Sequence, residues 1–190
     1  MRVLNKDEFK LEKENIFEEI KNGAMFIYPT DTIYGIGCNA LDYKSVKMVR
    51  EAKERYTRPF SVIAPSKEWI RENCVVDKKK EQWIEKLPGP YTLILKLKDK
   101  DVIAPNVNSD MDTLGVRIPK HWFTQELKKL GIPIVTTSAN IIGEAFMTSL
   151  DDLNRKIKEK VDFIIYEGEI KGKPSQIVDL TKEEAEIIKR

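Results

Sequence analysis

The sequence has few of the side chains that build metal centres and disulfide frameworks. It contains two cysteines, Cys38 and Cys74, and one histidine, His121. Two cysteines cannot form a disulfide framework or a four-thiolate metal site, and one histidine rules out a multi-histidine centre. We therefore expect no metal held by the protein's own side chains, and we expect both cysteines to be buried or half-buried.

Long apolar segments are also missing. The longest stretch without a charged side chain, residues 130–143, contains Pro133 and is shorter than the roughly 20 apolar residues that a membrane-spanning helix needs. The first residues include Arg2, Lys6 and Asp7 and no apolar core, so the sequence predicts no secretory signal. We expect a cytoplasmic protein without a membrane partner.

Familiar catalytic and nucleotide-binding motifs are absent. There is no G-x-x-x-x-G-K-[ST], and Gly35-Ile36-Gly37 lacks the third glycine and the acidic residue of a dinucleotide-binding fingerprint. His121 is alone, and no G-x-S-x-G surrounds a serine, which disfavours a Ser-His-Asp triad. The sequence therefore does not favour covalent hydrolytic catalysis.

The composition is that of a globular protein with nearly balanced charge. The chain has 190 residues, of which 41% are hydrophobic and 34% charged, with a net charge of +2. A chain of this length buries roughly 70% of its unfolded surface, so we expect one domain over residues 1–190. The charge balance predicts that the whole chain is not an electrostatic nucleic-acid binder, although a local basic patch stays open.

Helices and strands are predicted to alternate along the chain. Hydrophobic spacing and capping residues predict helices at 6–20, from 42 to before Pro59, from 66, and at 78–87, 120–130 and 149–160. Strands are expected at 24–28, 60–64, 91–98, 114–118, 132–136, 162–166, 175–180 and 185–188. Leucines on one face of 91–98 indicate a half-exposed strand, so the pattern predicts an α/β fold with a mixed sheet.

Polar clusters follow two of the predicted strands. One is Thr30-Asp31-Thr32, and the other is residues 136–140. Ligands of open α/β sheets collect at the carboxyl ends of strands, so these side chains could bind phosphate or an amino acid. The same residue types also make turns and cap helices, and the pattern leaves both roles open.

Two groups of cations stand out. Lys53, Arg55 and Arg58 come just before Pro59, at what should be an exposed helix end. They could neutralise a polyphosphate, or they could simply be solvated cations that favour the helix dipole. Arg117 lies inside the apolar run 114–118, so its charge must face solvent, a cavity or a partner.

Six segments in order carry a family resemblance. They are Tyr-Pro-Thr-Asp-Thr-Ile-Tyr-Gly-Ile-Gly at 28–37, Lys-Glu-Arg with Arg-Pro-Phe at 53–60, Pro-Gly-Pro-Tyr-Thr-Leu at 88–93, Val-Arg-Ile-Pro at 116–119, Ser-Ala-Asn at 138–140 with Gly143 and Thr148, and Ser-Gln-Ile-Val-Asp at 175–179. Together they resemble the YrdC-type family, the threonylcarbamoyl-AMP synthases. The resemblance covers nearly the whole chain and points to the short, single-domain form.

The resemblance implies a fold and a reaction. The fold would be an open, twisted, mixed sheet with flanking helices and a large cavity. The enzyme, a nucleotidyltransferase, would convert L-threonine, bicarbonate and ATP into threonylcarbamoyl-AMP and pyrophosphate. Mg²⁺ would arrive with the ATP rather than in a protein cage. Separate downstream proteins would then transfer the threonylcarbamoyl group to an adenosine of tRNA.

The resemblance also assigns site residues. Catalytic roles on the triphosphate fall to Lys53 and Arg55. The implied ATP-binding set is Lys53, Arg55, Arg58, Thr113, Ser138, Asn140, Thr148 and Arg190. The implied threonine-binding set is Thr30, Thr32, Tyr34, Arg117 and Ser175, with Arg117 as the partner of the threonine carboxylate.

Three positions depart from the family pattern. Tyr56 stands where proline is usual, Ile63 stands near a common threonine-contacting histidine, and Gln176 replaces a threonine. Two alternatives therefore stay open. One is a paralogue that binds nucleotide and double-stranded RNA or tRNA without making the adenylate. The other is a relative that uses a different small substrate, as in the carbamoyl-adenylate chemistry of hydrogenase maturation.

Overall fold

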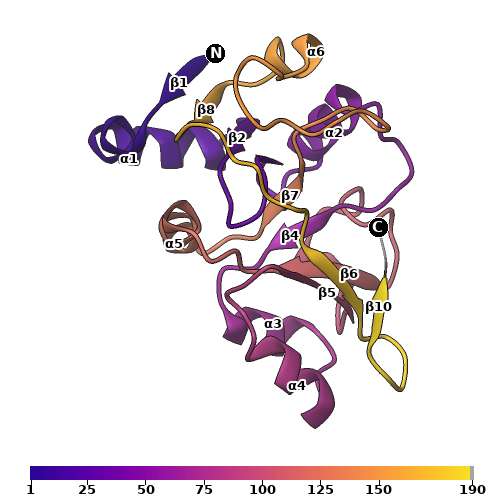
Figure 1. Ribbon diagram of the computed structural model, residues 1–190. Coiled ribbons are helices and arrows are strands. Elements are labelled where there is room, and N and C mark those ends of the chain that lie inside the picture. The colour runs from indigo at the N-terminus through magenta and orange to yellow at the C-terminus, as the bar shows by residue number, and fades with distance from the viewer. Residues whose placement is uncertain (189–190) are drawn as a thin grey trace.

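The computed structural model describes residues 1–188 and contains one mixed sheet (Figure 1). The order of its strands is β1-β8-β2-β3-β7-β4-β6-β5-β9-β10. Their bounds are β1 Arg2–Leu4, β2 Phe26–Tyr28, β3 Gly35–Gly37, β4 Ser61–Ile63, β5 Tyr91–Lys96, β6 Thr113–Arg117, β7 Ile134–Ser138, β8 Phe163–Ile165, β9 Gln176–Asp179 and β10 Glu186–Ile188. Parallel pairs such as β4 with β6 adjoin antiparallel pairs such as β5 with β6, which confirms the predicted mixed sheet.

Helices flank the sheet, and most begin at a side-chain cap. They are α1 Lys6–Lys21, α2 Tyr43–Ala52, α3 Lys67–Asn73, α4 Lys78–Ile84, α5 Trp122–Leu127 and α6 Arg155–Lys158, with short 3-10 turns at Lys100–Val102 and Lys128–Leu130. The Asp42 and Ser66 side chains accept hydrogen bonds from the first turns of α2 and α3, as their positions in the sequence predict. No helix within residues 1–188 combines the length and apolar character needed to cross a membrane.

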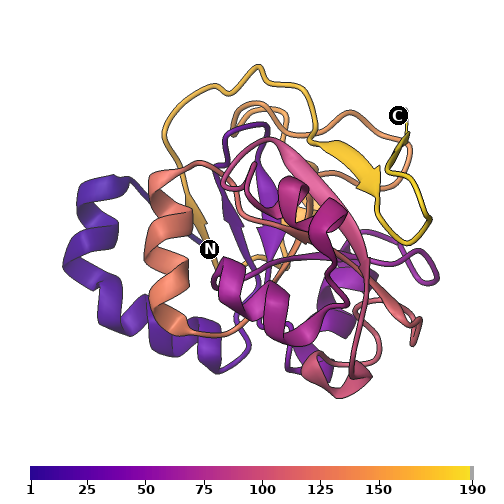
Figure 2. The ribbon, with the colours of Figure 1, turned by 90° about the horizontal axis from the view of Figure 1, so that it is seen from below.

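Two hydrophobic cores cover opposite faces of the sheet around β2. Helices α1 and α5 lie side by side (Figures 1 and 2), with the ring centroids of Phe9 and Phe123 5.3 Å apart. Phe26 stacks on Phe163 beneath them, at 5.2 Å. The next residue along β2, Ile27, points to the other face and packs in the core that includes α2. Both cysteines are buried and free, as expected.

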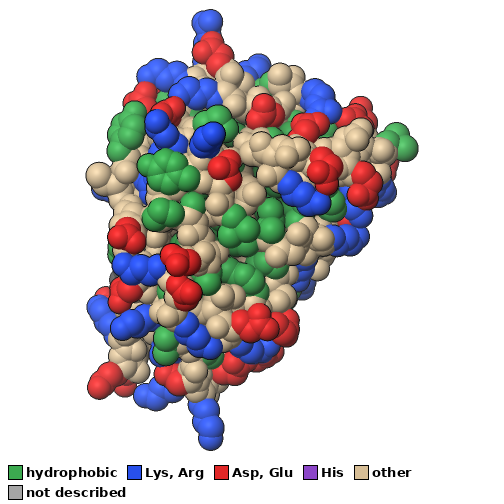
Figure 3. Space-filling model, turned by 180° about the vertical axis from the view of Figure 1, so that it is seen from behind, with side chains coloured by type: hydrophobic (Ala, Val, Ile, Leu, Met, Phe, Trp, Pro, Cys, Tyr) green, Lys and Arg blue, Asp and Glu red, His purple; other side chains and the backbone are tan. Residues whose placement is uncertain are grey.

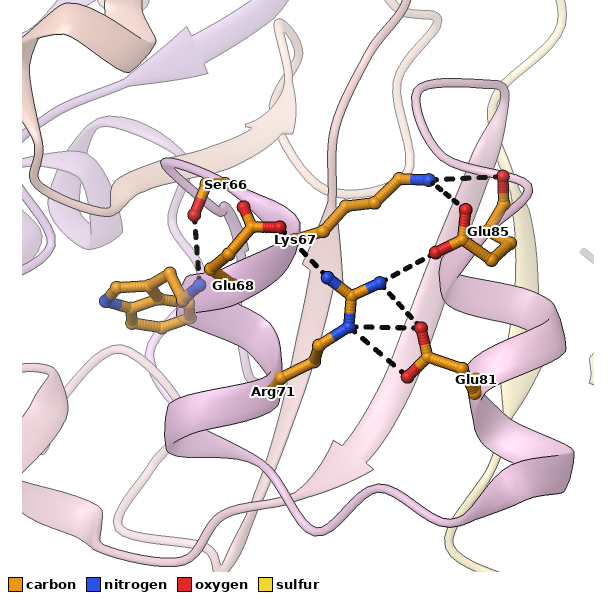
Figure 4. Close-up of polar contacts among 7 residues, drawn as sticks. Ser66, Lys67, Glu68, Arg71, Glu81 and Glu85 are labelled. Atoms are coloured by element: carbon orange, nitrogen blue, oxygen red, sulfur yellow. Dashed lines mark hydrogen bonds and ion pairs between the residues drawn. The ribbon is translucent and has the colours of Figure 1, made fainter.

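Helices α3 and α4 cover one face of the sheet at β5. Arg71 of α3 joins it to α4, because its guanidinium lies 2.6 Å from Glu81 and 2.7 Å from Glu85 (Figure 4). The buried side chains of these helices pack in the same core as Leu93 and Leu95 of β5. Alternate residues of β5 therefore point away from these helices, and they are free to line a site on the opposite face.

Three elements differ from the prediction. The segment 35–37, which lies outside the predicted strands, forms β3 because it pairs with β2 on one side and β7 on the other. Strand β1 was not predicted, and it forms by parallel pairing with β8. The predicted helix at 149–160 shrinks to α6, because Asp152 accepts hydrogen bonds from the backbone of Thr148 and Ser149 in a turn, and Asn154 caps the helix instead.

Candidate active site

A cavity of about 380 Å³ opens on the face of the sheet that α3 and α4 leave uncovered. Its floor comes from alternate residues of neighbouring strands, which point to the same side. These floor residues are Ser61 of β4, Thr92 and Ile94 of β5, Thr113, Gly115 and Arg117 of β6, Thr136 and Ser138 of β7, and Ile177 of β9. The fold therefore presents a row of hydroxyl groups and one arginine at the bottom of a cavity.

Many of the residues predicted for the site meet in this cavity. The lining residues include Thr30, Tyr34, Arg117 and Ser175 of the threonine set and Arg55, Thr113 and Ser138 of the ATP set. Thr32, Lys53, Arg58, Asn140 and Thr148 do not line it. Arg190 lies outside the described residues. The two predicted sets thus share one cavity, with several members placed behind its wall.

Arg117 is the charged group of the cavity floor. Its Nη2 donates to Asp31 Oδ1 at 3.1 Å and to Thr32 Oγ1 at 3.3 Å. Its Nε is buried and has no hydrogen-bond partner within residues 1–188. Burial lowers the pKa of Arg117, and Tyr28 and Asp31 oppose that shift. An unpaired buried donor costs about 1–3 kcal/mol, so Nε carries an unmet need for an acceptor.

The loop around Asp31 is held by its own hydroxyl groups. Thr30 Oγ1 accepts hydrogen bonds from the backbone N–H groups of Thr32 and Ile33 and donates to Ile33 O at 2.7 Å. It also lies 2.9 Å from Thr32 Oγ1. Asp31 Oδ2 in turn accepts from Lys120 N at 2.9 Å. These contacts shape the loop so that the Asp31 carboxylate stays against Arg117.

Residues 167–175, which we call the strap, lie across this loop. The Tyr34 hydroxyl donates to Gly168 O at 2.7 Å and accepts from Glu167 N at 3.2 Å. Burial raises the pKa of Tyr34 to about 12. At the far end of the strap, Ser175 Oγ lies 2.8 Å from Thr92 Oγ1. The Tyr34 hydroxyl is thus occupied by the strap, while its ring lines the cavity.

The strap touches the loop at Gly172. A Cβ atom at this position would lie 1.6 Å from the carbonyl oxygen of Thr32, so a larger residue cannot fit without movement of one segment. The Glu167 carboxylate anchors the start of the strap to the residues at the beginning of α5. It lies 2.8 Å from His121 Nε2 and accepts a hydrogen bond from Trp122 Nε1 at 2.9 Å. The strap therefore fixes one rim of the cavity.

Lys53 corrects one of our expectations. We expected an exposed helix end, but the Lys53 side chain is only 1% exposed, because α2 ends against the loop that follows β7. Its Nζ donates to Ser138 O and Asn140 O, both at 2.5 Å. Burial, with a smaller contribution from Arg55, lowers the pKa of Lys53 to about 7. Arg58 is exposed as expected, and Arg55 is half-buried at the cavity wall.

Sequence reasoning missed much of the cavity floor. Ser61, Thr92 and Gly115 were not predicted, although small or hydroxyl residues alternate with large apolar ones in their strands. That alternation was a usable signal, because a face of small polar residues in a buried strand needs a polar environment. Within residues 1–188, no group of three or more His, Cys, Asp or Glu side chains could hold a metal ion.

Comparisons with known proteins identify relatives along nearly the whole chain. Residues 18–190 match the family model described as "Telomere recombination", which groups Sua5, YciO and YrdC. A Methanocaldococcus jannaschii protein, provisionally named a threonylcarbamoyl-AMP synthase, is 38% identical over 93% of this chain and 84% of its own length. The threonylcarbamoyl-AMP synthase of Vibrio campbellii is 28% identical over 87% of this chain and 92% of its own length.

A solved structure shares the fold. The crystal structure of P. abyssi Sua5 complexed with L-threonine superimposes with a TM-score of 0.87 and 29% identity, over 99% of this chain. The match covers 56% of that protein, so the present chain spans about half of its length. The P. abyssi structure contains bound L-threonine, and the present cavity lies in a domain with the same fold.

Lys53 gives the stability of the fold a pH dependence. Between pH 7 and 10.5 the native state releases the Lys53 proton while the unfolded chain keeps it, so this residue's contribution to stability rises with pH. The slope is at most about 1.4 kcal/mol per pH unit. Urea unfolding at pH 7 to 9.5 should show that the free energy of unfolding of wild type rises with pH relative to that of Lys53→Met. Lys47→Met, an exposed lysine of α2, is the control, and a pH-independent gap for Lys53→Met would contradict the account.

Gly172→Ala should loosen the strap. The new Cβ cannot coexist with the Thr32 carbonyl, so the strap should lift and expose the bond after Lys171. We expect trypsin to cleave after Lys171 several-fold faster in Gly172→Ala than in wild type. Lys173→Gln, at an exposed strap position, is the matched control and should be cut like wild type. Equal cleavage of Gly172→Ala and wild type would show that this contact does not hold the strap.

Proposed function

The chain belongs to the Sua5, YciO and YrdC family, and from this premise we propose that it is an L-threonylcarbamoyladenylate synthase. It would join L-threonine, bicarbonate and ATP into threonylcarbamoyl-AMP and release pyrophosphate. The observation that carries the proposal is the cavity floor, where a buried arginine, whose Nε has no hydrogen-bond partner within residues 1–188, lies among residues with hydroxyl groups.

The Arg117 end of the cavity suits an amino acid. A guanidinium binds a carboxylate with strong, directed hydrogen bonds, and Nε is the donor still available for one. The hydroxyl groups of Thr92 and Ser175 stand nearby as a pair and can bind the amine or the side-chain hydroxyl of threonine. We therefore assign Arg117 to the threonine carboxylate, with Thr30, Thr32, Tyr34 and Ser175 shaping the subsite.

The Arg55 end suits a polyphosphate. Arg55, Thr113 and Ser138 line the cavity. Lys53 and Asn140 lie behind Ser138, where they hold the loop after β7. We assign this end to ATP, with Arg58 at its exposed edge and Thr148 beside the strap, where Thr148 O accepts from Ile170 N. Mg²⁺ would be carried by the nucleotide.

The reaction needs positioning and charge stabilisation from these residues. The amine of threonine forms an N–C bond with bicarbonate, whose C–O bond breaks with loss of water, to give a carbamate. A carbamate oxygen then attacks the α-phosphorus of ATP, and the bond from that phosphorus to pyrophosphate breaks. Negative charge builds up on the departing pyrophosphate, where Arg55 and the positive end of the cavity would stabilise it. Holding both substrates in one cavity replaces an encounter in solution, which can account for much of the rate.

The three departures from the family pattern do not alter the cavity wall. Tyr56 is 67% exposed, Ile63 is buried in the core beneath α5, and Gln176 is exposed, and none of the three lines the cavity. This favours the synthase over the alternative that binds nucleotide and RNA without making the adenylate. On the face in Figure 3, basic and acidic side chains are mixed, whereas RNA binding favours a continuous basic surface.

The proposed reaction also implies downstream partners and a location in the cell. Threonylcarbamoyl-AMP is an unstable mixed anhydride, so it must pass to downstream proteins that transfer its acyl group to tRNA. We place the protein in the cytoplasm with those partners, and we do not require it to bind tRNA itself.

The test is detection of the adenylate by mass spectrometry after mixing the protein with ATP, L-threonine and bicarbonate, with serine in a parallel reaction. We expect product and pyrophosphate with threonine. Arg117→Lys keeps the charge but loses the forked donors, so it should raise KM for threonine about 10-fold or more and leave KM for ATP within about twofold. No adenylate with either amino acid, despite ATP binding, would refute the synthase and favour the non-catalytic paralogue.

A further inference from the structure

The last turn of α2 contains a second buried cation that neither the resemblance nor the reaction assigns. Arg50 is 6% exposed, and it precedes the buried Lys53 by one helical turn. Its Nε donates to Asn106 O at 2.7 Å. Its two Nη atoms donate to four further oxygens: Arg55 O at 2.9 Å, Arg58 O at 3.1 Å, Val107 O at 3.2 Å and Ser109 Oγ at 3.3 Å.

The charge of Arg50 is not neutralised by these contacts. All five acceptors are backbone carbonyls or a hydroxyl, and the acceptors of Lys53 are carbonyl and amide oxygens. The nearby Glu54 is engaged elsewhere, 2.6 Å from Lys156 Nζ. Burying a cation without a carboxylate costs free energy. An anion bound close by would offset this cost, and Arg55 is the nearby cation that lines the cavity.

Arg50 also joins the two loops that form this end of the cavity. One loop, residues 53–60, carries Arg55, and the other, residues 103–112, leads into β6. Two further contacts join the loops directly, because Phe60 N donates to Val107 O at 2.8 Å and Ser109 Oγ donates to Thr57 O at 2.6 Å. Arg50 sits at their junction with five hydrogen bonds, which fix both loops at once.

Arg50 supports Arg55 through an aromatic ring as well. The guanidinium of Arg50 lies 4.6 Å from the centre of the Phe60 ring, and that of Arg55 lies 5.0 Å from it. Arg55 Nη2 also donates to Pro59 O at 2.5 Å, so the direction of Arg55 depends on the shape of the loop. A change at Arg50 would therefore be felt at Arg55, which contacts the cavity, although Arg50 does not line it.

We propose that Arg50 is a positioning residue for the polyphosphate. It holds loops 53–60 and 103–112 together so that Arg55 faces the cavity, and it adds positive charge behind that wall. The ligand class is a di- or triphosphate chain, as in pyrophosphate or the phosphates of ATP. The inference rests on the proposed function only in identifying that chain with the nucleotide substrate.

The first measurement is the binding of inorganic pyrophosphate by calorimetry to the wild type and to Arg50→Met, Arg50→Lys and Ser109→Ala. We expect Kd to rise about 10-fold or more for Arg50→Met and by less for Arg50→Lys, which keeps the charge but cannot make five bonds. Ser109→Ala, which removes one link between the loops, should weaken binding two- to threefold. Lys47→Met removes a cation from the exposed side of α2 and should bind pyrophosphate within twofold of wild type.

The second measurement separates positioning from a general loss of structure. In steady-state assays, KM for ATP should rise in the Arg50 variants while KM for threonine stays within about twofold. Unchanged pyrophosphate binding in a folded Arg50→Met would overturn the proposal, and so would equal weakening for both substrates. Complete recovery in Arg50→Lys would overturn the positioning by five hydrogen bonds.

Two further outcomes keep the tests independent. If the Arg50 variants do not fold, Ser109→Ala decides, because unchanged pyrophosphate binding in that variant would also overturn the proposal. Calorimetry needs no turnover. A wild type that makes no adenylate while Arg50→Met loses pyrophosphate binding would therefore refute the proposed function and support the positioning role.

Discussion

Buried positive charge is the constraint around which this molecule is arranged. Arg50, Lys53 and Arg117 are all less than a tenth exposed, yet among the described residues 1–188 only Arg117 of these three has a carboxylate partner, Asp31. The other two are held by oxygens of the backbone and of uncharged side chains. The chain must bring loops together to supply those oxygens, and our proposal is that anionic substrates offset the cost of the arrangement. The loops that supply oxygens to the buried cations therefore also shape one end of the cavity.

The sheet makes that arrangement compatible with a stable fold. Successive residues of β5 and β6 serve opposite purposes, since Leu93 and Leu95 build the core with α3 and α4 while Thr92 and Ile94 line the cavity. Gly115 keeps the floor open, because a Cβ there would lie 2.4 Å from Ser61 Oγ. Strand alternation therefore lets one short sheet provide a dry core on one face and a polar site on the other.

The sequence predicted what depends on local pattern and missed what depends on distant partners. The α/β class and the capped helices followed from periodicity and capping residues. The charge of Arg117 within an apolar run left solvent, a cavity or a partner open, and the structure places it in the cavity floor. The burial of Lys53 did not, because its acceptors lie more than eighty residues away at Ser138 and Asn140. Strand β3 was missed for the same reason, since a three-residue strand is defined by its neighbours. Arg50 gave no signal, because its acceptors are backbone oxygens, which no side-chain pattern reveals.

The central claim is that two arginines mark the two ends of one cavity, with an amino-acid carboxylate at Arg117 and a polyphosphate at Arg55. A crystal structure with L-threonine and a non-hydrolysable ATP analogue tests it most directly. The account predicts the threonine carboxylate within hydrogen-bonding distance of Arg117 Nε and the phosphates beside Arg55, with Arg50 still bound to both loops. Threonine bound elsewhere, with Arg117 Nε still unpaired, would contradict it.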